Sequence, residues 1–231
     1  MERASLRTGL NGSALVGLLS NLKLLDGPSA KPSFVQGMAQ WLGWADAIPL
    51  SAALHAPLRD PARPARAPAS PAPAEREFER VRATLRRLID EDGTSAGARR
   101  NAPPPDDDDF APHRQRYARV QQAMQTAIEP LRAQARAAVA SLSPQMERLA
   151  GLDAVMEPVL GAHEQAALAI MPTLAQQHFD RLRKAAADNG TPWREVFRKD
   201  MQRLLQAELE LRLQPVRGLI EAQRSQPQGT S

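Results

Sequence analysis

Residues 113–142, which read HRQRYARVQQAMQTAIEPLRAQARAAVASL, decide the fold of this chain. Apolar side chains recur in this stretch at steps of three and four residues, which is the spacing of one helix face. The repeat continues over several heptads, as it does in coiled coils. The members of this seam are Tyr117, Val120, Met124, Ile128, Leu131, Ala135, Ala138 and Leu142. The stretch therefore predicts a long helix that packs one face against other helices.

Four prolines lie at a constant spacing of two heptads in and after this stretch: Pro130, Pro144, Pro158 and Pro172. A proline inside a helix removes a backbone hydrogen bond and costs roughly 3 kcal/mol. We therefore expect the helical zone to bend or restart at these positions. The alternative is that the spacing arises by chance in a chain with 20 prolines. Ser143-Pro144 fits either a turn or a kink.

Helical periodicity continues beyond Pro144. Asp188-Asn189-Gly190 is a candidate left-handed helix end, and Thr191-Pro192 then opens a final helix that runs to about Arg224. Pro215 should kink or restart that helix. With no strand-like alternation, the chain is predicted to be all-α, an antiparallel bundle of long kinked helices over residues 111–224.

The rest of the chain divides by composition. Residues 1–55 are predicted to be a small N-terminal helical unit, residues 75–92 an amphipathic helix, and residues 225–231 a polar tail. A Pro/Ala-rich linker at 56–74 and an acidic loop at 93–110 have little apolar content, so we expect both to be disordered.

The N-terminal unit carries two of the three tryptophans, Trp41 and Trp44. Helices are expected to begin near Ser13, Ser33 and Asp46. Their apolar surface exceeds what three short helices can bury among themselves, so the unit should dock on the long helices or on a partner. Trp41 and Trp44 are therefore candidate partner-binding residues, with ordinary core packing as the alternative.

Composition excludes several classes of chemistry. The chain has no cysteine, which rules out disulfides, thiolate nucleophiles and cysteine-ligated metals, and we expect a cytoplasmic protein. The apolar run at residues 10–25 is interrupted by polar residues and lacks a cleavage site, so a signal peptide is not predicted. No apolar run is long enough to span a membrane.

Motifs for catalysis and metal binding fail on inspection. His163-Glu164 begins a zinc-protease signature, but Ala167 occupies the place of the second histidine. The four histidines are never at ligand spacing, and we expect them on polar helix faces. The run Asp106 to Asp109 lacks the alternation of a calcium loop. The sequence therefore predicts no catalytic residue, no metal site and no cofactor, and we expect the protein not to be an enzyme.

Basic side chains gather around the turn at residues 189–190 and form a candidate anion-binding tip. They are Arg181, Arg183, Lys184, Arg194, Arg198, Lys199 and Arg203. Such a tip could bind phosphate groups of nucleic acid or of an anionic surface. Acidic residues are interleaved with them, however, so a salt-bridged, solvated face is the alternative.

Four short segments carry a resemblance to a known family. They read WLGWADAIPLSAAL at 41–54, AIEPLR at 127–132, LDAVME at 152–157 and ELELRLQPV at 208–216. Through them the chain resembles an uncharacterised proteobacterial family of unknown function. The resemblance implies an association with flagellar-motor-like or OmpA-like membrane proteins, beside which family members look to be encoded. It transfers no catalytic residue.

Two functional hypotheses follow. The leading hypothesis is a non-enzymatic helical interaction protein, an accessory subunit of a membrane-associated complex or a self-associating protein, because long apolar seams offer surface without chemistry. The alternative is nucleic-acid or anionic-surface binding through the tip at residues 181–203.

Overall fold

The computed structural model describes residues 13–25, 44–55, 71–91, 109–189 and 192–225. Every regular element in these ranges is a helix, and they contain no strand, so the predicted all-α fold is confirmed. The helices are α2 (Ala14–Asn21), α4 (Trp44–His55), α5 (Pro71–Asp90), α6 (Ala111–Ala140), α7 (Pro144–Leu168), α8 (Met171–Asn189), α9 (Trp193–Arg212) and α10 (Gln214–Arg224).

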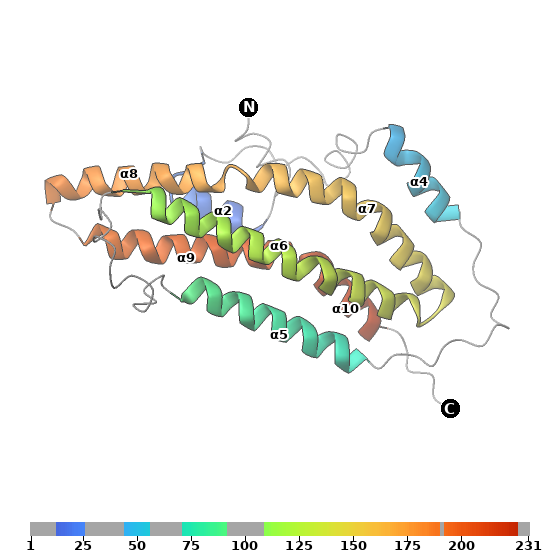
Figure 1. The fold of residues 1–231 in the computed structure, drawn as a ribbon. Helices are drawn as coiled ribbons and strands as arrows, with labels where there is room; N and C mark the ends of the chain where they lie inside the picture. The colour runs from blue at the N-terminus through green and yellow to red at the C-terminus, as the bar shows by residue number, and fades with distance from the viewer. Residues whose placement is uncertain (1–12, 26–43, 56–70, 92–108, 190–191, 226–231) are drawn as a thin grey trace.

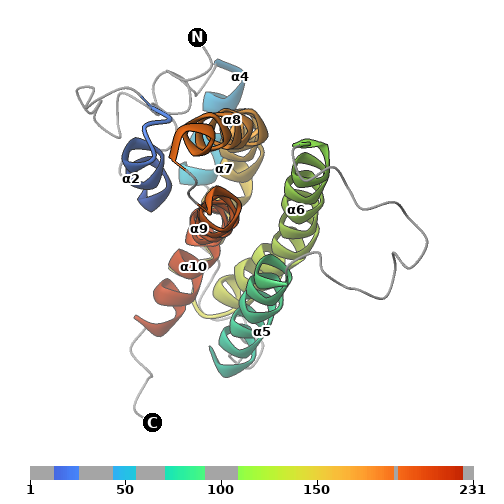
Figure 2. The same ribbon diagram turned by 90° about the vertical axis from the view of Figure 1, so that its left-hand side faces the viewer.

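The long helices lie side by side as antiparallel rods (Figure 1). Helix α8 continues the direction of α7 after a short break, and α10 follows α9 in the same way. Helix α6 contacts α5, α7 and α10, while α8 packs on α9. Figure 2, which looks along the rods, shows α9 between α2 and α6. The middle of the bundle is therefore formed by α6 and α9.

The prolines act in two ways. Pro144, Pro172 and Pro215 lie in the first turns of α7, α8 and α10, where a missing N–H costs nothing, and the chain restarts at each of them. Pro130 and Pro158 instead lie inside α6 and α7, which continue through them. Helix α7 curves visibly along its length (Figure 1). The predicted restarts are found at Pro144, Pro172 and Pro215, whereas α6 continues through Pro130, and Ser143-Pro144 is a turn.

The apolar seam predicted for residues 113–142 forms the buried face of α6. Its buried residues are Tyr117, Val120, Met124, Ile128, Leu131, Ala135 and Val139. Val139 takes the place predicted for Ala138, and Leu142 is only half-buried. Val139 is reached because a straight α-helix has 3.6 residues per turn and drifts away from a strict seven-residue repeat. Leu142 lies in the turn that follows the end of α6 at Ala140.

The N-terminal helices dock on different parts of the bundle. Ser13 caps α2, and its hydroxyl oxygen accepts a hydrogen bond from the amide of Val16 at 3.3 Å. Helix α2 then packs on α9, whereas α4 packs on α7. Helix α4 begins at Trp44, so Pro49 lies inside it. The helix expected from Ser33 falls mostly on residues 26–43, which lie outside the described residues.

The predicted linker and acidic loop are described only at their edges. Helix α5 begins at Pro71, inside the Pro/Ala-rich segment, and residues 56–70 and 92–108 lie outside the described residues. Phe110, at the end of the acidic segment, is buried. Its ring packs against Phe179 and Phe197 at centroid distances of 5.5 and 6.2 Å. Phe110 therefore belongs to the hydrophobic core and directly precedes α6.

Candidate functional site

Helix α7 is the long helix whose apolar side chains are least covered. Of its 25 residues, the buried ones are Ala150, Ala167 and Leu168. The larger apolar residues between positions 146 and 160 are all half-buried: Met146, Leu149, Leu152, Val155, Met156, Val159 and Leu160. They spread around the helix because α7 packs against α6 on one side and α4 on another. Neither neighbour covers them fully.

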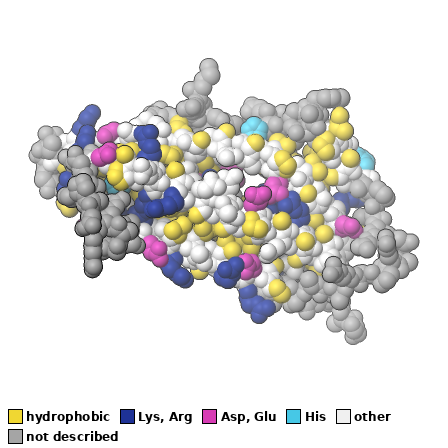
Figure 3. All heavy atoms as spheres, in the orientation of Figure 1, with side chains coloured by type: hydrophobic (Ala, Val, Ile, Leu, Met, Phe, Trp, Pro, Cys, Tyr) yellow, Lys and Arg dark blue, Asp and Glu magenta, His cyan; other side chains and the backbone are white. Residues whose placement is uncertain are grey.

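Helix α4 extends this partly covered surface. Ile48 and Leu54 are 61% and 48% exposed. Figure 3 shows hydrophobic side chains gathered over the region of α4 and α7, toward the upper right. We call this surface, formed by α4 and the first half of α7, the outer layer. Trp44 begins α4 but its side chain is not among those described, and Trp41 lies outside the described residues.

The basic residues predicted as an anion-binding tip lie at the opposite end of the bundle from α4 (Figure 1). Arg183 and Lys184 are on α8, and Arg194 and Arg198 are on α9. The Arg194 guanidinium lies over the Trp193 ring, 5.1 Å from its centroid. Arg183 lies 3.8 Å from Asp180. Part of the tip is therefore paired with an acidic side chain or stacked on an aromatic ring, which agrees with the alternative of a salt-bridged face.

Other cations of this end also have partners. The Lys199 ammonium lies 2.7 Å from the Glu195 carboxylate. Arg203 lies 3.2 Å from Asp200. Arg181 is exposed but is held away from the open tip, because its guanidinium donates to the backbone oxygens of Leu22 and Lys23 on the N-terminal segment.

His178 corrects the expectation that all histidines lie on polar helix faces. Its side chain is buried, with 3% of the residue exposed. Nε2 lies 2.9 Å from the Asp200 carboxylate, and Nδ1 lies 2.8 Å from Arg181. His178 is on the apolar face of α8, four residues after Leu174. Packing of α8 on α9 therefore buries it, and Asp200 satisfies its polar edge.

Helices α6 and α7 are joined by a ladder of ion pairs. The Arg132 guanidinium makes two parallel hydrogen bonds to Asp153, at 3.1 and 2.6 Å. One turn further along, Arg136 bonds to Glu157 at 2.6 Å. Such fork-to-fork pairs are strong and directional. All four side chains are partly buried, so the ladder fixes the register of α7 on α6.

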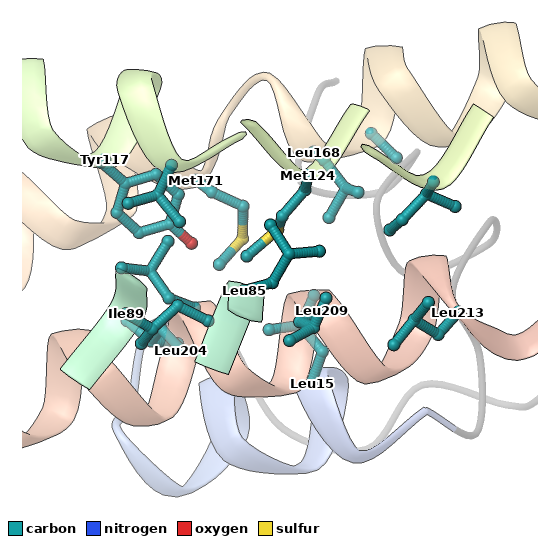
Figure 4. Close-up of a cluster of buried hydrophobic side chains, with 14 of the residues drawn as sticks. Leu15, Leu85, Ile89, Tyr117, Met124, Leu168, Met171, Leu204, Leu209 and Leu213 are labelled. Carbon is teal, nitrogen blue, oxygen red and sulfur yellow. The ribbon is translucent and has the colours of Figure 1, made fainter. Parts of the chain in front are cut away.

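A buried carboxylate joins α9 to α6. Glu208 of α9 is fully buried. It accepts hydrogen bonds from the Tyr117 hydroxyl and the Gln121 amide, both at 3.0 Å, and from Arg212 at 2.8 Å. Figure 4 shows Tyr117 reaching from α6 toward α9. Burial, and secondly the neighbouring Glu208 carboxylate, raise the pKa of Tyr117 well above its ordinary value.

A cleft of about 170 Å³ opens between α6, α7 and the α9–α10 junction. Arg132, Glu157, Glu164 and Arg212 contribute to its wall, and Figure 3 shows acidic and basic side chains side by side in the middle of this face. Burial raises the pKa of Glu164, although the Arg212 guanidinium, 3.4 Å away, lowers it. Both arginines of the wall are bonded to carboxylates, so these groups join helices to one another.

Sequence reasoning missed these buried polar residues, although their positions carried a signal. Glu208 lies four residues after Leu204, and Asp200 lies three after Phe197, so both occupy the apolar face of α9. A charged residue at such a position is buried only if it is paired. The sequence does not show which residues pair with it.

Among the described residues, no group of three or more histidine, aspartate or glutamate side chains is arranged to hold a metal ion. No helix in the described part of the chain is long and apolar enough to cross a membrane.

Comparison with known proteins identifies the family of this chain but no individual relative. Neither the curated proteins nor the solved structures contain a match. Residues 1–225 match the family described as "Protein of unknown function (DUF3348)". This match covers nearly the whole chain, including α4, the α6–α7 ladder and the Glu208 network. The chain therefore belongs to the DUF3348 family of proteins of unknown function.

Proposed function

We propose that this chain is a non-enzymatic interaction protein that binds another protein through the outer layer. The observation that carries the proposal is the incomplete burial of α7. A helix with apolar residues on several faces is normally covered on all of them. Among the described residues, α6 and α4 are the main neighbours of α7, and they leave its apolar residues between 146 and 160 half-buried.

Helix α4 supports the same proposal. It presents Ile48 and Leu54 to solvent beside the half-buried apolar residues of α7. Contiguous exposed apolar surface on a water-soluble domain marks a site of protein interaction. Asp46 and His55 are the only ionisable side chains that the sequence places on α4, which suits the charge-poor centre of an interface.

The partner that we propose lies in a membrane-associated complex, in which this chain is an accessory subunit on the cytoplasmic side. The resemblance to proteobacterial proteins encoded beside flagellar-motor-like or OmpA-like components supports this choice. Self-association of this chain through the outer layer is a simpler alternative to binding a membrane-associated partner. The two are separated by measuring the mass of the purified protein in solution at micromolar concentration and by pull-down from membrane extracts of the native host.

The experiment replaces Ile48 and Leu54 by aspartate in one double variant. We expect its thermal melt to stay close to that of the wild type, while binding weakens by about 2 kcal/mol or more, roughly a thirtyfold loss of affinity. The matched control is Ala133→Asp with Ala137→Asp, two exposed positions on α6 that add the same charge. Undiminished binding by the first variant, or a wild-type protein that stays monomeric and retains no partner, would remove the proposal.

A second candidate function rests on a specific contact at the tip. Arg194 and Arg183 lie over the Trp193 and Phe179 rings, and an arginine held flat on an aromatic ring can present its edge to a phosphate. Nucleic-acid or anionic-surface binding there predicts affinity that falls steeply with salt.

The test of this second function is an electrophoretic retardation assay at low and moderate salt. Arg194→Ala with Arg198→Ala should weaken retardation. Arg76→Ala with Arg119→Ala, which removes two exposed cations elsewhere, should not. Absence of retardation at low salt, or equal weakening by both variants, counts against nucleic-acid or anionic-surface binding at the tip.

A further inference from the structure

The turn that follows helix α2 has an unusual backbone conformation. Lys23 has φ of 53°, in the left-handed region that usually needs glycine. The turn is closed by bonds from the amide of Leu24 to the oxygen of Leu19 and from the amide of Lys23 to the oxygen of Ser20. A lysine in this conformation carries strain, so neighbouring contacts must hold it there.

Arg181 of α8 supplies those contacts. Its guanidinium donates to the backbone oxygens of both Leu22 and Lys23, with the Lys23 bond at 3.2 Å. These are end-of-helix carbonyls that have no partner within α2. A single side chain of α8 therefore clamps the turn that follows α2.

The position of Arg181 is set in turn by His178. Arg181 also donates to His178 Nδ1 at 2.8 Å. A guanidinium has no acceptor, so Nδ1 must carry a lone pair. The proton of the neutral ring is then on Nε2, which donates to Asp200 at 2.9 Å. The buried imidazole is thus required to be neutral for the clamp to close.

We propose that this arrangement is a proton-controlled latch for the N-terminal segment at residues 13–25. A second proton on His178 places an N–H against the guanidinium of Arg181, which must then move away. The backbone oxygens of Leu22 and Lys23 lose their donor, and the strained Lys23 turn loses its support. Acidification therefore releases the segment, and neutral pH holds it.

The charged groups around the ring fit this function. Asp200 of α9 faces Nε2 and stabilises the imidazolium, although its other oxygen is shared with Arg203 at 3.2 Å. Arg181 of α8 faces Nδ1 and opposes the imidazolium. On the α6 side, the His113 ring packs against the Phe197 ring, which also packs against the His178 ring. Uptake of the proton is consequently coupled to the departure of Arg181.

Release would uncover apolar surface on α9. Leu15 and Leu19 of α2 are fully buried. Figure 4 shows Leu15 against α9, beside Leu209. The latch therefore governs whether this part of α9 is covered by the chain's own N-terminal segment.

The test is hydrogen exchange followed by mass spectrometry on the full chain, with rates corrected for the intrinsic effect of pH. Protection of residues 13–25 should be high at neutral pH and should fall when the protein is acidified. Loss of one charge-assisted hydrogen bond corresponds to a fall of roughly tenfold. Residues 111–140 of α6 serve as the internal reference and should keep their protection.

Two variants and one control make the result decisive. In His178→Gln, the amide can accept from Arg181 and donate to Asp200 without taking a proton, so protection should stay high at both pH values. In Arg181→Gln, protection should be low at both. His163→Gln, an exposed histidine on α7, should behave as the wild type.

The latch is overturned if residues 13–25 and 111–140 lose protection together in the wild type, or if the wild type shows no change with pH. It is also overturned if His178→Gln responds to pH as the wild type does. Should His178→Gln fail to fold, Arg181→Gln decides alone, because a surviving pH response in that variant contradicts the proposal.

Discussion

Helices α9 and α7 have similar lengths, 20 and 25 residues, but they are buried in different ways. Helix α9 has one continuous buried face, made of Phe197, Asp200, Met201, Leu204, Leu205, Glu208 and Leu209. Helix α7 keeps most of its large apolar residues half-exposed and is joined to α6 by Arg132 and Arg136. Stability should therefore reside mainly in α9, whereas α7 carries the surface that we propose for a partner.

The largest effect is expected from Glu208→Ala. This change leaves the Tyr117 hydroxyl, the Gln121 amide and the Arg212 guanidinium without their shared acceptor. Removing one member of a buried charge pair costs about 3–5 kcal/mol. The free energy of unfolding in urea measures the loss.

The matched control for this prediction is Glu210→Ala, two residues further along α9. Glu210 also pairs with arginines, including Arg82 at 2.9 Å, but it lies near the surface. The expected loss is about 1 kcal/mol or less. Equal losses at the two positions would show that burial of Glu208 is not what makes it important.

A smaller difference should separate two leucines of the two helices. Leu209→Ala removes a fully buried side chain from α9 and should cost about 3 kcal/mol. Leu152→Ala removes a half-buried one from α7 and should cost about 1 kcal/mol, because less apolar area returns to water. Both are measured by urea unfolding. If Leu152→Ala were as costly as Leu209→Ala, α7 would belong to the core and the outer layer would lose its basis.

The smallest effect concerns Glu164 of α7. Because burial raises its pKa in the folded protein, the folded state binds this proton more tightly than the unfolded state does. The contribution to stability is therefore present at low pH and is lost as pH rises through the folded-state pKa. Glu164→Gln should stabilise the protein at neutral pH, and the gain should disappear in acid below the ordinary glutamate pKa. A urea midpoint at neutral pH that falls in the variant would contradict this sign.

Much of the fold could be predicted because its determinants are local. The seam of α6 follows from the spacing of Tyr117, Val120 and Met124, and the starts of α2 and α7 follow from Ser13 and Ser143, whose hydroxyls accept from Val16 and Met146. Each of these signals acts within one or two turns of the chain. The candidate site was less predictable: the helix expected from Asp46 begins at Trp44, and Arg194 lies at the tip, but Arg181 lies in the clamp of the turn that follows α2.

The sequence by itself determined that this protein is a bundle of helices interrupted at prolines, because helix periodicity, caps and proline geometry depend on neighbours in the chain. Only the tertiary structure decided that Glu208 joins Tyr117, that His178 joins Asp200 and Arg181, and that α2 covers α9. The physical reason is that a buried polar group can be satisfied by many partners. The packing of helices that are far apart in the sequence decides which of these partners a buried polar group contacts.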